Sequence, residues 1–165
     1  MRTIIHLSFL ITMLALTPSH AAEPRVDQAD LALLAGAPFS GTLSYLDYSS
    51  DVVEKRPVSI QFKAPRRGRI SYEVSYPDNA YYNSKERLVI SRSGDQLNGE
   101  PIISREQLDD GTLIIVTAFR GEDNNQPADI RMTYAVHTNK LEIRKEVRFD
   151  GERIFFERNA YRLTR

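Results

Sequence analysis

The 165-residue sequence contains no cysteine. This absence excludes disulfide bonds, thiolate zinc sites, catalytic thiols and a lipidated amino-terminal cysteine. Histidine is almost as scarce, because His137 is the only one beyond the first 22 residues. A single histidine excludes most histidine-based metal sites and weakens every catalytic scheme that needs a histidine base. The composition therefore predicts a protein that is not an enzyme and that uses no metal or other cofactor.

Neither sign of charge is in excess, since 22 lysines and arginines balance 22 aspartates and glutamates. Arg2 is the only charged residue before Ala22, so the chain beyond this point keeps 21 cations against 22 anions, a net charge of −1. No bulk electrostatic attraction to nucleic acid or to an anionic membrane follows from this balance.

Long apolar runs are missing except at the amino terminus. There Arg2 precedes an apolar run, Ile4–Leu16, and a step of small residues ends at Ala21 and Ala22. This order is typical of a secretory signal peptide, whereas a membrane anchor needs about 20 uninterrupted apolar residues. We therefore predict that residues 1–21 are a signal peptide cleaved near Ala21. The mature protein is then periplasmic or secreted, in a bacterium, with no transmembrane segment.

The remaining chain has the length of one ordinary domain. Residues 22–37 are predicted to be an N-terminal segment with a short helix over Val26–Ala35, which Gly36 ends. After Pro38 the hydrophobic period changes to two, which indicates strands with one wet and one dry face. Strands are expected near residues 39–48, 58–62, 70–76, 85–92, 112–120, 130–137, 141–149 and 153–163, with a weaker one over 96–104 that Pro101 interrupts.

The connections between these strands are too short to hold crossover helices, so neighbours in sequence should pair in antiparallel fashion. Residues 38–165 are therefore predicted to form an all-β, up-and-down meander barrel of eight to ten strands. A membrane-spanning barrel is disfavoured, because Glu142, Arg144 and Glu146 on the wet face would have to face lipid. An arginine or lysine on the lipid-facing surface destabilises a membrane barrel by about 2–4 kcal/mol at the middle of the bilayer.

A short helix leads into Gly36, Phe39 and Gly41, and an antiparallel meander follows. This arrangement resembles the start of lipocalin-like (calycin) barrels, with Phe39 where those families usually carry tryptophan. The stretch Gly41–Ser50 also resembles small exported bacterial proteins of unassigned function. The architectural resemblance spans about residues 33–163. It implies a barrel with an interior cavity, which often binds an apolar ligand. It identifies no catalytic residue in this sequence.

The last three strands predict a candidate site. A two-residue loop at Asn139–Lys140 would set Tyr134 opposite Lys145, and a second one at Asp150–Gly151 would place Arg158 diagonally beside Lys145 on the inner face. Two buried cations without a counter-ion are costly. We therefore predict that Tyr134, Lys145 and Arg158 bind the anionic end of a small amphipathic ligand.

Other readings of these residues stay open. A bulge at Gly151 would slip the last strand by one residue and bring Glu157 to Lys145 as an internal ion pair. Alternatively, Lys145 would lie near a barrel rim with its ammonium group in water.

The cations of the loop Lys63–Arg69 would either contact lipid phosphates or simply be solvated. The loop Gly121–Pro127 is rich in oxygen ligands but lacks the spacing of a calcium loop.

Two functions remain possible from the sequence. The first is an exported envelope protein that binds or carries a small amphipathic or hydrophobic ligand. The alternative is an envelope structural or protein-interaction module with a packed barrel and no ligand. The interior volume of the barrel distinguishes them, since ligand cavities measure about 300 Å³ or more.

Overall fold

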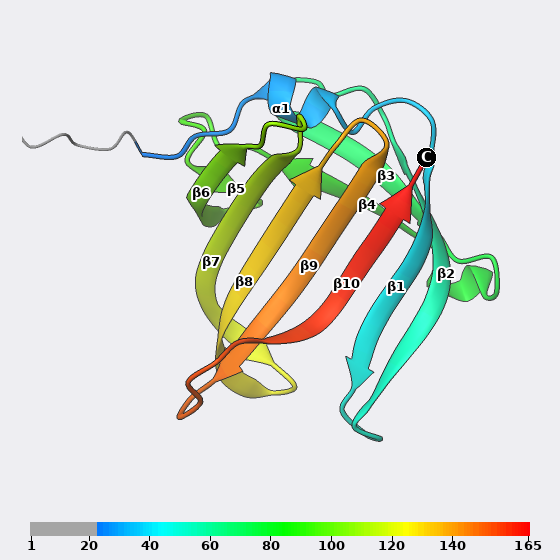
Figure 1. Ribbon diagram of the computed structural model, residues 1–165, viewed down its shortest axis with the longest axis vertical. Helices are drawn as coiled ribbons and strands as arrows, with labels where there is room; N and C mark the ends of the chain where they lie inside the picture. Colours follow the sequence, from blue (N-terminus) through cyan, green and yellow to red (C-terminus); the bar gives the residue numbers. More distant parts are fainter. Residues whose placement is uncertain (1–22) are drawn as a thin grey trace, which may run out of the picture.

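The computed structural model describes residues 23–165, so the predicted signal peptide lies outside the described residues. Ten antiparallel strands form a nearly closed up-and-down barrel with one short α-helix (Figure 1), which confirms the predicted fold class. The strands are β1 (Phe39–Asp47), β2 (Val52–Phe62), β3 (Arg69–Ser75), β4 (Ser84–Val89), β5 (Gln96–Leu97), β6 (Glu100–Gln107), β7 (Leu113–Asp123), β8 (Gln126–Val136), β9 (Lys140–Phe149) and β10 (Phe156–Thr164). No helix among residues 23–165 is long and apolar enough to cross a membrane.

The sheet has the order β4-β3-β2-β1-β10-β9-β8-β7-β6-β5. Successive strands pair with one another except β4 and β5, which are the two edges of the sheet, and the pairing of β1 with β10 joins the first strand to the last. The edges β4 and β5 meet through a single bridge between Ile90 and Leu97. The backbone N–H of Val89 also donates to Oδ1 of Asn98 at 2.8 Å. These few bonds leave the barrel nearly, rather than fully, closed.

Helix α1 (Gln28–Ala32) is shorter than the predicted span Val26–Ala35. Asp27 begins it as the N-cap of a capping box with Asp30, an arrangement that satisfies N–H groups without intrahelical partners. The helix lies across the upper end of the barrel in Figure 1. Leu31 and Leu34 enter the main core there, so α1 plugs this end.

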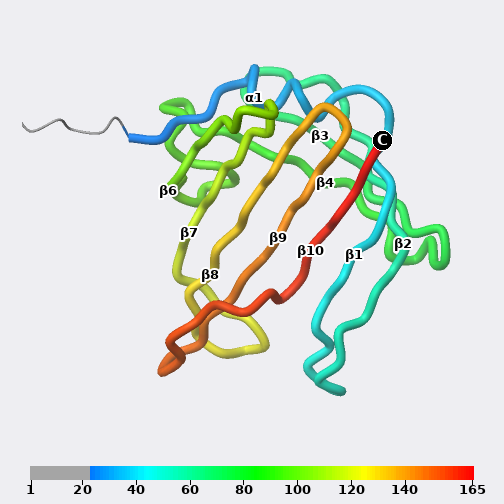
Figure 2. Tube along the Cα trace, in the orientation of Figure 1, coloured from blue at the N-terminus to red at the C-terminus, as the bar shows by residue number. Residues whose placement is uncertain are grey.

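The strands differ in length, and this difference shapes the inner face. β3 and β4 have 7 and 6 residues, whereas β2, β7 and β8 have 11 each. Figure 2 shows β3 and β4 passing behind the upper ends of β8 to β10, while β1, β2 and β7 to β10 continue below them. The main core fills the end near α1, and a second apolar cluster around Ile130 and Val147 lies further down. Part of the concave face therefore remains open.

The predicted register of the β8–β9 hairpin is wrong by two residues. The N–H of His137 donates to the carbonyl of Lys140 at 2.8 Å, so the loop is Thr138–Asn139. Tyr134 consequently lies opposite Ile143 rather than Lys145. A shift of two preserves the inward face of every residue, which is why the predicted inner face is still correct.

The predicted two-residue turn between β9 and β10 is also wrong. The connection runs from residue 150 to 155, and a bulge between Glu157 and Asn159 shifts the register of β10. The alternative bulge at Gly151 is not the one that forms. Arg158 is the extra residue of the bulge, and bulges commonly redirect a side chain.

One predicted loop proves to be mostly strand, and one predicted strand is interrupted at a different place. β7 and β8 extend through most of Gly121–Pro127 and are joined by a tight turn at Asn124 and Asn125, both with positive φ. The weak strand over 96–104 is interrupted at a turn containing Asn98 and Gly99, while Pro101 lies within β6.

Candidate functional site

The interior of the barrel near α1 is filled by side chains. The void lined by Leu31, Leu34 and Tyr134 measures only about 10 Å³, which is at the lower limit for one water molecule. Burial raises the pKa of the Tyr134 hydroxyl. The interior cavity implied by the calycin resemblance is therefore missing around Tyr134, and any site for a larger ligand must lie elsewhere.

A groove of about 480 Å³ opens on the concave face. We call it the tyrosine groove and define it by Leu43, Tyr45, Arg56, Tyr76, Tyr82 and Tyr161. Leu43 of β1 lies opposite Tyr161 of β10 on one side and Arg56 of β2 on the other. Leu43, Tyr76 and Tyr161 also pack against the main core. The groove therefore has an apolar floor on three adjacent strands and aromatic walls.

The walls of the groove are fixed by polar contacts of its tyrosines. The Tyr76 and Tyr161 hydroxyls lie 3.3 Å apart. The Tyr82 ring packs edge-on against the Tyr76 ring, with 6.2 Å between centroids. Tyr82 ends the short 3-10 helix η1 (Ala80–Tyr82), which Asn79 caps by accepting from the N–H of Tyr81 at 3.0 Å. These contacts preorganise an amphipathic surface with both aromatic faces and hydroxyl groups.

Arg56 brings a positive charge to the groove. Its guanidinium carbon lies 4.8 Å from the centroid of the Tyr82 ring and 5.7 Å from that of Tyr45, within the range of cation–π contacts. Its Nε donates to the Tyr45 hydroxyl at 3.1 Å. Among residues 23–165, no carboxylate oxygen lies within 4.0 Å of this guanidinium. The Tyr45 hydroxyl donates in turn to the Glu54 carboxylate at 2.7 Å, so this carboxylate is linked to Arg56 only through the hydroxyl. The aromatic rings orient the guanidinium, which keeps N–H groups for an anion.

A buried ionic cluster adjoins the groove through Arg158, which also lines it. Its centre is Asp123 at the end of β7, whose side chain is only 6% exposed. Asp123 accepts hydrogen bonds from Lys145 Nζ and, at 2.7 Å, from the Tyr48 hydroxyl. Arg158 Nε lies 3.3 Å from the same carboxylate. We call these four residues the Asp123 cluster.

The Asp123 cluster holds two cations around one anion. Burial alone would raise the pKa of Asp123, but the hydrogen bonds from Lys145 and Tyr48 and the charge of Arg158 outweigh burial and lower it. Burial and the hydrogen bond to Asp123 raise the pKa of Tyr48, so its hydroxyl stays a donor. With Asp123 ionised, the formal charges of the two cations and the one carboxylate sum to +1.

The structure brings two of the three predicted site residues together. Lys145 and Arg158 meet on the carboxylate of Asp123, while the guanidinium of Arg158 also lies 4.2 Å from the centroid of the Tyr48 ring. Tyr134 lines the filled interior instead. The alternative pairing of Lys145 with Glu157 is wrong, because Glu157 pairs with Arg162. Ligand binding by Tyr134, Lys145 and Arg158 remains a prediction.

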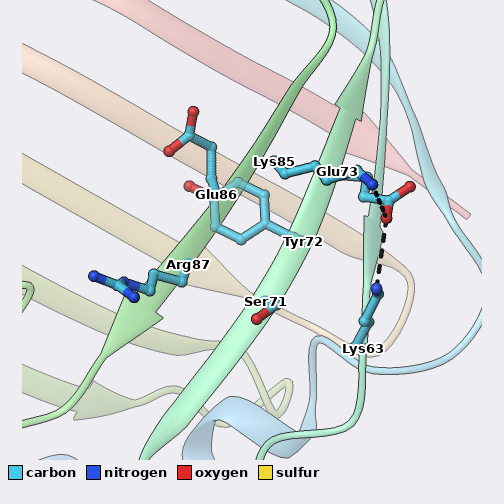
Figure 3. Close-up of a pocket in the computed structure, with 7 residues that line it drawn as sticks. All are labelled: Lys63, Ser71, Tyr72, Glu73, Lys85, Glu86 and Arg87. Atoms are coloured by element: carbon cyan, nitrogen blue, oxygen red, sulfur yellow. Dashed lines mark ion pairs between the residues drawn. The ribbon is translucent and has the colours of Figure 1, made fainter.

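Figure 3 shows another hollow, of about 400 Å³, over β3 and β4. Glu73 lies between Lys63 and Lys85, with 3.5 and 3.7 Å from its Oε1 to their ammonium nitrogens. Exposed ion pairs of this kind contribute at most about 1 kcal/mol. Burial raises the pKa of Tyr72, which also lines this hollow, to about 12. Three cations face two carboxylates in this hollow, and Glu73 already engages both lysines, so we do not take the hollow as the candidate site.

Comparison of the chain with protein-family models, curated proteins and solved structures finds no match. The candidate site therefore depends on geometry alone. Sequence reasoning missed Asp123, which it placed in a loop, and the tyrosines of the groove. A signal for Asp123 was present, since Asn124-Asn125 suits a two-residue hairpin turn and would have extended the strand to Asp123.

Proposed function

We propose that this protein binds a small amphipathic ligand with an anionic end in the tyrosine groove. The observation that carries the proposal is an open aromatic groove of about 480 Å³ in which the Arg56 guanidinium forms no direct ion pair with any of residues 23–165. Ligand pockets typically have volumes of about 300–1,000 Å³ and a few convergent polar groups on an apolar lining. The groove has both properties.

The arrangement of the groove favours a particular orientation of the ligand. The apolar body would lie over Leu43 and Tyr161, and the anionic end would meet Arg56. Arg158 stands at the same groove with the excess positive charge of the Asp123 cluster behind it. A carboxylate, sulfonate or phosphate would accept charge-assisted hydrogen bonds from these guanidinium groups.

The proposed setting is the bacterial envelope, either in the periplasm or outside the cell. The signal-peptide pattern of residues 1–21 supports export. The barrel architecture is compatible with a calycin-like carrier, although the ligand would occupy an open groove rather than the filled interior.

A packed interaction module is the second candidate, and the filled interior favours it. The void beside Tyr134 measures only about 10 Å³, and Tyr81 at the rim of the groove is 88% exposed. Exposed aromatic residues are common in protein interfaces. In this case the groove would receive a protein side chain instead of a small molecule.

Replacing Arg56 with glutamine is expected to weaken binding of 1-anilinonaphthalene-8-sulfonate, an aromatic anion, by about tenfold or more. A lost hydrogen bond to a charged group costs about 1.5–3 kcal/mol, which corresponds to about tenfold to a hundredfold in affinity. Fluorescence titration of the folded protein measures this change. The matched control is Arg153→Gln, which removes an exposed arginine outside the groove and should leave the affinity unchanged.

Native mass spectrometry of protein purified from its own envelope separates the two candidates. The binding function predicts an added small-molecule mass that Arg56→Gln reduces and Arg153→Gln retains. Bare polypeptide in every sample, together with equal dye affinities of the two variants, would reject the groove as a ligand site and leave the interaction module.

A further inference from the structure

The end of the barrel near α1 carries a second hollow, of about 640 Å³, that the proposed function does not use. It lies at the other end of β3 from the tyrosine groove, because Arg69 begins this strand and Tyr76 follows its last residue. We call it the basic hollow and define it by its four arginines, Arg25, Arg67, Arg69 and Arg92.

The arginines of the basic hollow come from three separate parts of the chain. Arg25 precedes α1, Arg67 and Arg69 belong to the β2–β3 turn and the start of β3, and Arg92 follows β4. All four are exposed. Among residues 23–165 none of them has a carboxylate oxygen within 4.0 Å. The fold therefore gathers four exposed guanidinium groups, none of them in a direct ion pair with a described residue, in a protein whose total charges balance.

Backbone hydrogen bonds hold the three parts together. The N–H of Val26 donates to the carbonyl of Gly94 at 2.8 Å, and the N–H of Ile90 donates to the carbonyl of Gly68 at 2.8 Å. The N–H of Gly68 donates to Oε1 of Gln28 at 3.1 Å. The backbone around the basic hollow is therefore preorganised, and only side chains need to be ordered when an anion binds.

Of the residues that the structure describes, Asp27 is the only acidic one that lines the basic hollow. Its carboxylate already accepts from the N–H groups of Ala29 at 2.7 Å and Asp30 at 3.2 Å as the cap of α1. The nearby Asp95 also interacts with the charge of Arg25, and its carboxylate accepts hydrogen bonds from two serine hydroxyl groups. The balance around the hollow is therefore four guanidinium groups against two carboxylates that are engaged in the fold. This balance favours an anionic ligand.

The β2–β3 turn shows an unusual choice of residue. Arg66 and Arg69 exchange backbone hydrogen bonds of 2.8 and 3.0 Å, so Arg67 and Gly68 are the two central residues, both with positive φ. Asparagine or glycine is preferred at the first of these positions, because the left-handed conformation raises the backbone energy of other residues by about 1–2 kcal/mol. Arg67 therefore stands at the tip of the turn in a backbone conformation that destabilises it.

We propose that the basic hollow binds phosphate groups. The planar fork of a guanidinium group matches two oxygens of a phosphate and forms paired, charge-assisted hydrogen bonds with them. A phospholipid headgroup and a soluble phosphate present the same chemistry to the hollow. Both would bind at the end of the barrel opposite the tyrosine groove.

The test compares two double variants that remove the same charge. Arg67→Asn with Arg92→Gln alters the basic hollow, and asparagine suits the positive φ of the turn, so this variant should fold. Arg87→Gln with Arg153→Gln removes two exposed arginines elsewhere. Binding to vesicles of phosphatidylcholine with phosphatidylglycerol should fall about thirtyfold in the first variant, at about 1 kcal/mol per cation near the surface, and far less in the second.

Titration with inorganic phosphate distinguishes the two sources of the group. Shifts of the Arg67 and Arg92 Nε–H signals in nuclear magnetic resonance spectra, without selective loss of vesicle binding, would support a soluble phosphate ligand. Selective loss of vesicle binding without such shifts would support a lipid headgroup. Equal vesicle binding by the two double variants, combined with no phosphate-dependent shift of these signals, would overturn the proposal.

Discussion

Replacing Asp123 with asparagine is expected to lower the free energy of unfolding by about 3 kcal/mol at pH 7. The substitution keeps the size of the side chain but removes the only anion of the Asp123 cluster. Lys145 and Arg158, whose side chains are 24% and 22% exposed, would then face each other without a counter-ion. Partial exposure places the expected effect at the lower end of the 3–5 kcal/mol typical of broken buried pairs. Urea-induced unfolding measures the change.

A double-mutant cycle makes this prediction sharper. Lys145→Met in the native background removes one partner of Asp123 and should destabilise the protein. The same substitution in the Asp123→Asn background removes one of two uncompensated cations and should stabilise it. Such a reversal of sign is a direct measure of coupling between the two residues. The matched control is Asp150→Asn, at an exposed pair with Arg120, which should cost less than about 1 kcal/mol. Additive effects of Lys145 and Asp123 would contradict the cluster.

The effect of Asp123→Asn should depend on pH in a defined direction. The pKa of Asp123 is lowered in the folded protein, so its carboxylate stabilises the fold at every pH above the unfolded value of about 3.9. This contribution is lost as the pH falls through the folded pKa. The difference in unfolding free energy between the native protein and Asp123→Asn should therefore be constant near neutral pH and shrink below about pH 4.

The strand pattern could be predicted because it depends only on alternation. Val58, Ile60 and Phe62 point inward as their period of two requires, and all three are buried. The faces of β8 and β9 were also predictable, since the error of two residues in their hairpin leaves every side chain on its face. Local sequence therefore suffices for the fold class and for most of the inner face.

The site was less predictable because it depends on strand partners and on irregular backbone. Arg158 reaches Asp123 from a bulge between Glu157 and Asn159, and no residue type in that segment marks a bulge. Asp123 itself was hidden by treating its strand end as a loop. The tyrosine groove needs the length difference between β3 and its longer neighbours, together with the packing of η1. These features arise from tertiary packing, which overrides local propensity.

The segment that contains Gly36, Phe39 and Gly41 lies where the first and last strands of the barrel meet. Phe39 is fully buried, and the guanidinium carbon of Arg165 lies 4.3 Å from the centroid of its ring. A side chain at Gly41 would come within 2.2 Å of the Arg162 carbonyl oxygen, so β1 and β10 approach closely only because this residue is glycine. The stretch therefore joins the first and last strands, and Arg165 lies at this junction.

Replacing Arg165 with alanine is expected to lower the free energy of unfolding by about 3 kcal/mol, because one guanidinium group serves several parts of the fold at once. It donates to the Thr138 carbonyl in the β8–β9 loop at 2.6 Å. It also donates to four carbonyls that follow α1, at 3.0 to 3.4 Å, those of Leu33, Leu34, Ala35 and Ala37. A charged hydrogen bond contributes about 1.5–3 kcal/mol and a well-packed cation–π contact up to about 2 kcal/mol, and such terms are not fully additive.

Chemical denaturation and hydrogen exchange together test the role of Arg165. Arg165→Ala should lower the unfolding free energy and speed exchange in α1, since the segment after α1 loses its tie to the barrel. Arg165→Lys should recover only part of the loss, because an ammonium group cannot span this spread of carbonyls as a guanidinium fork does. The control is Arg162→Ala, whose side chain is 48% exposed and bonds to Glu157 at 2.5 Å; it should cost about 1 kcal/mol or less. Equal losses for the Arg165→Ala and Arg162→Ala variants would show that Arg165 does not hold α1 on the barrel.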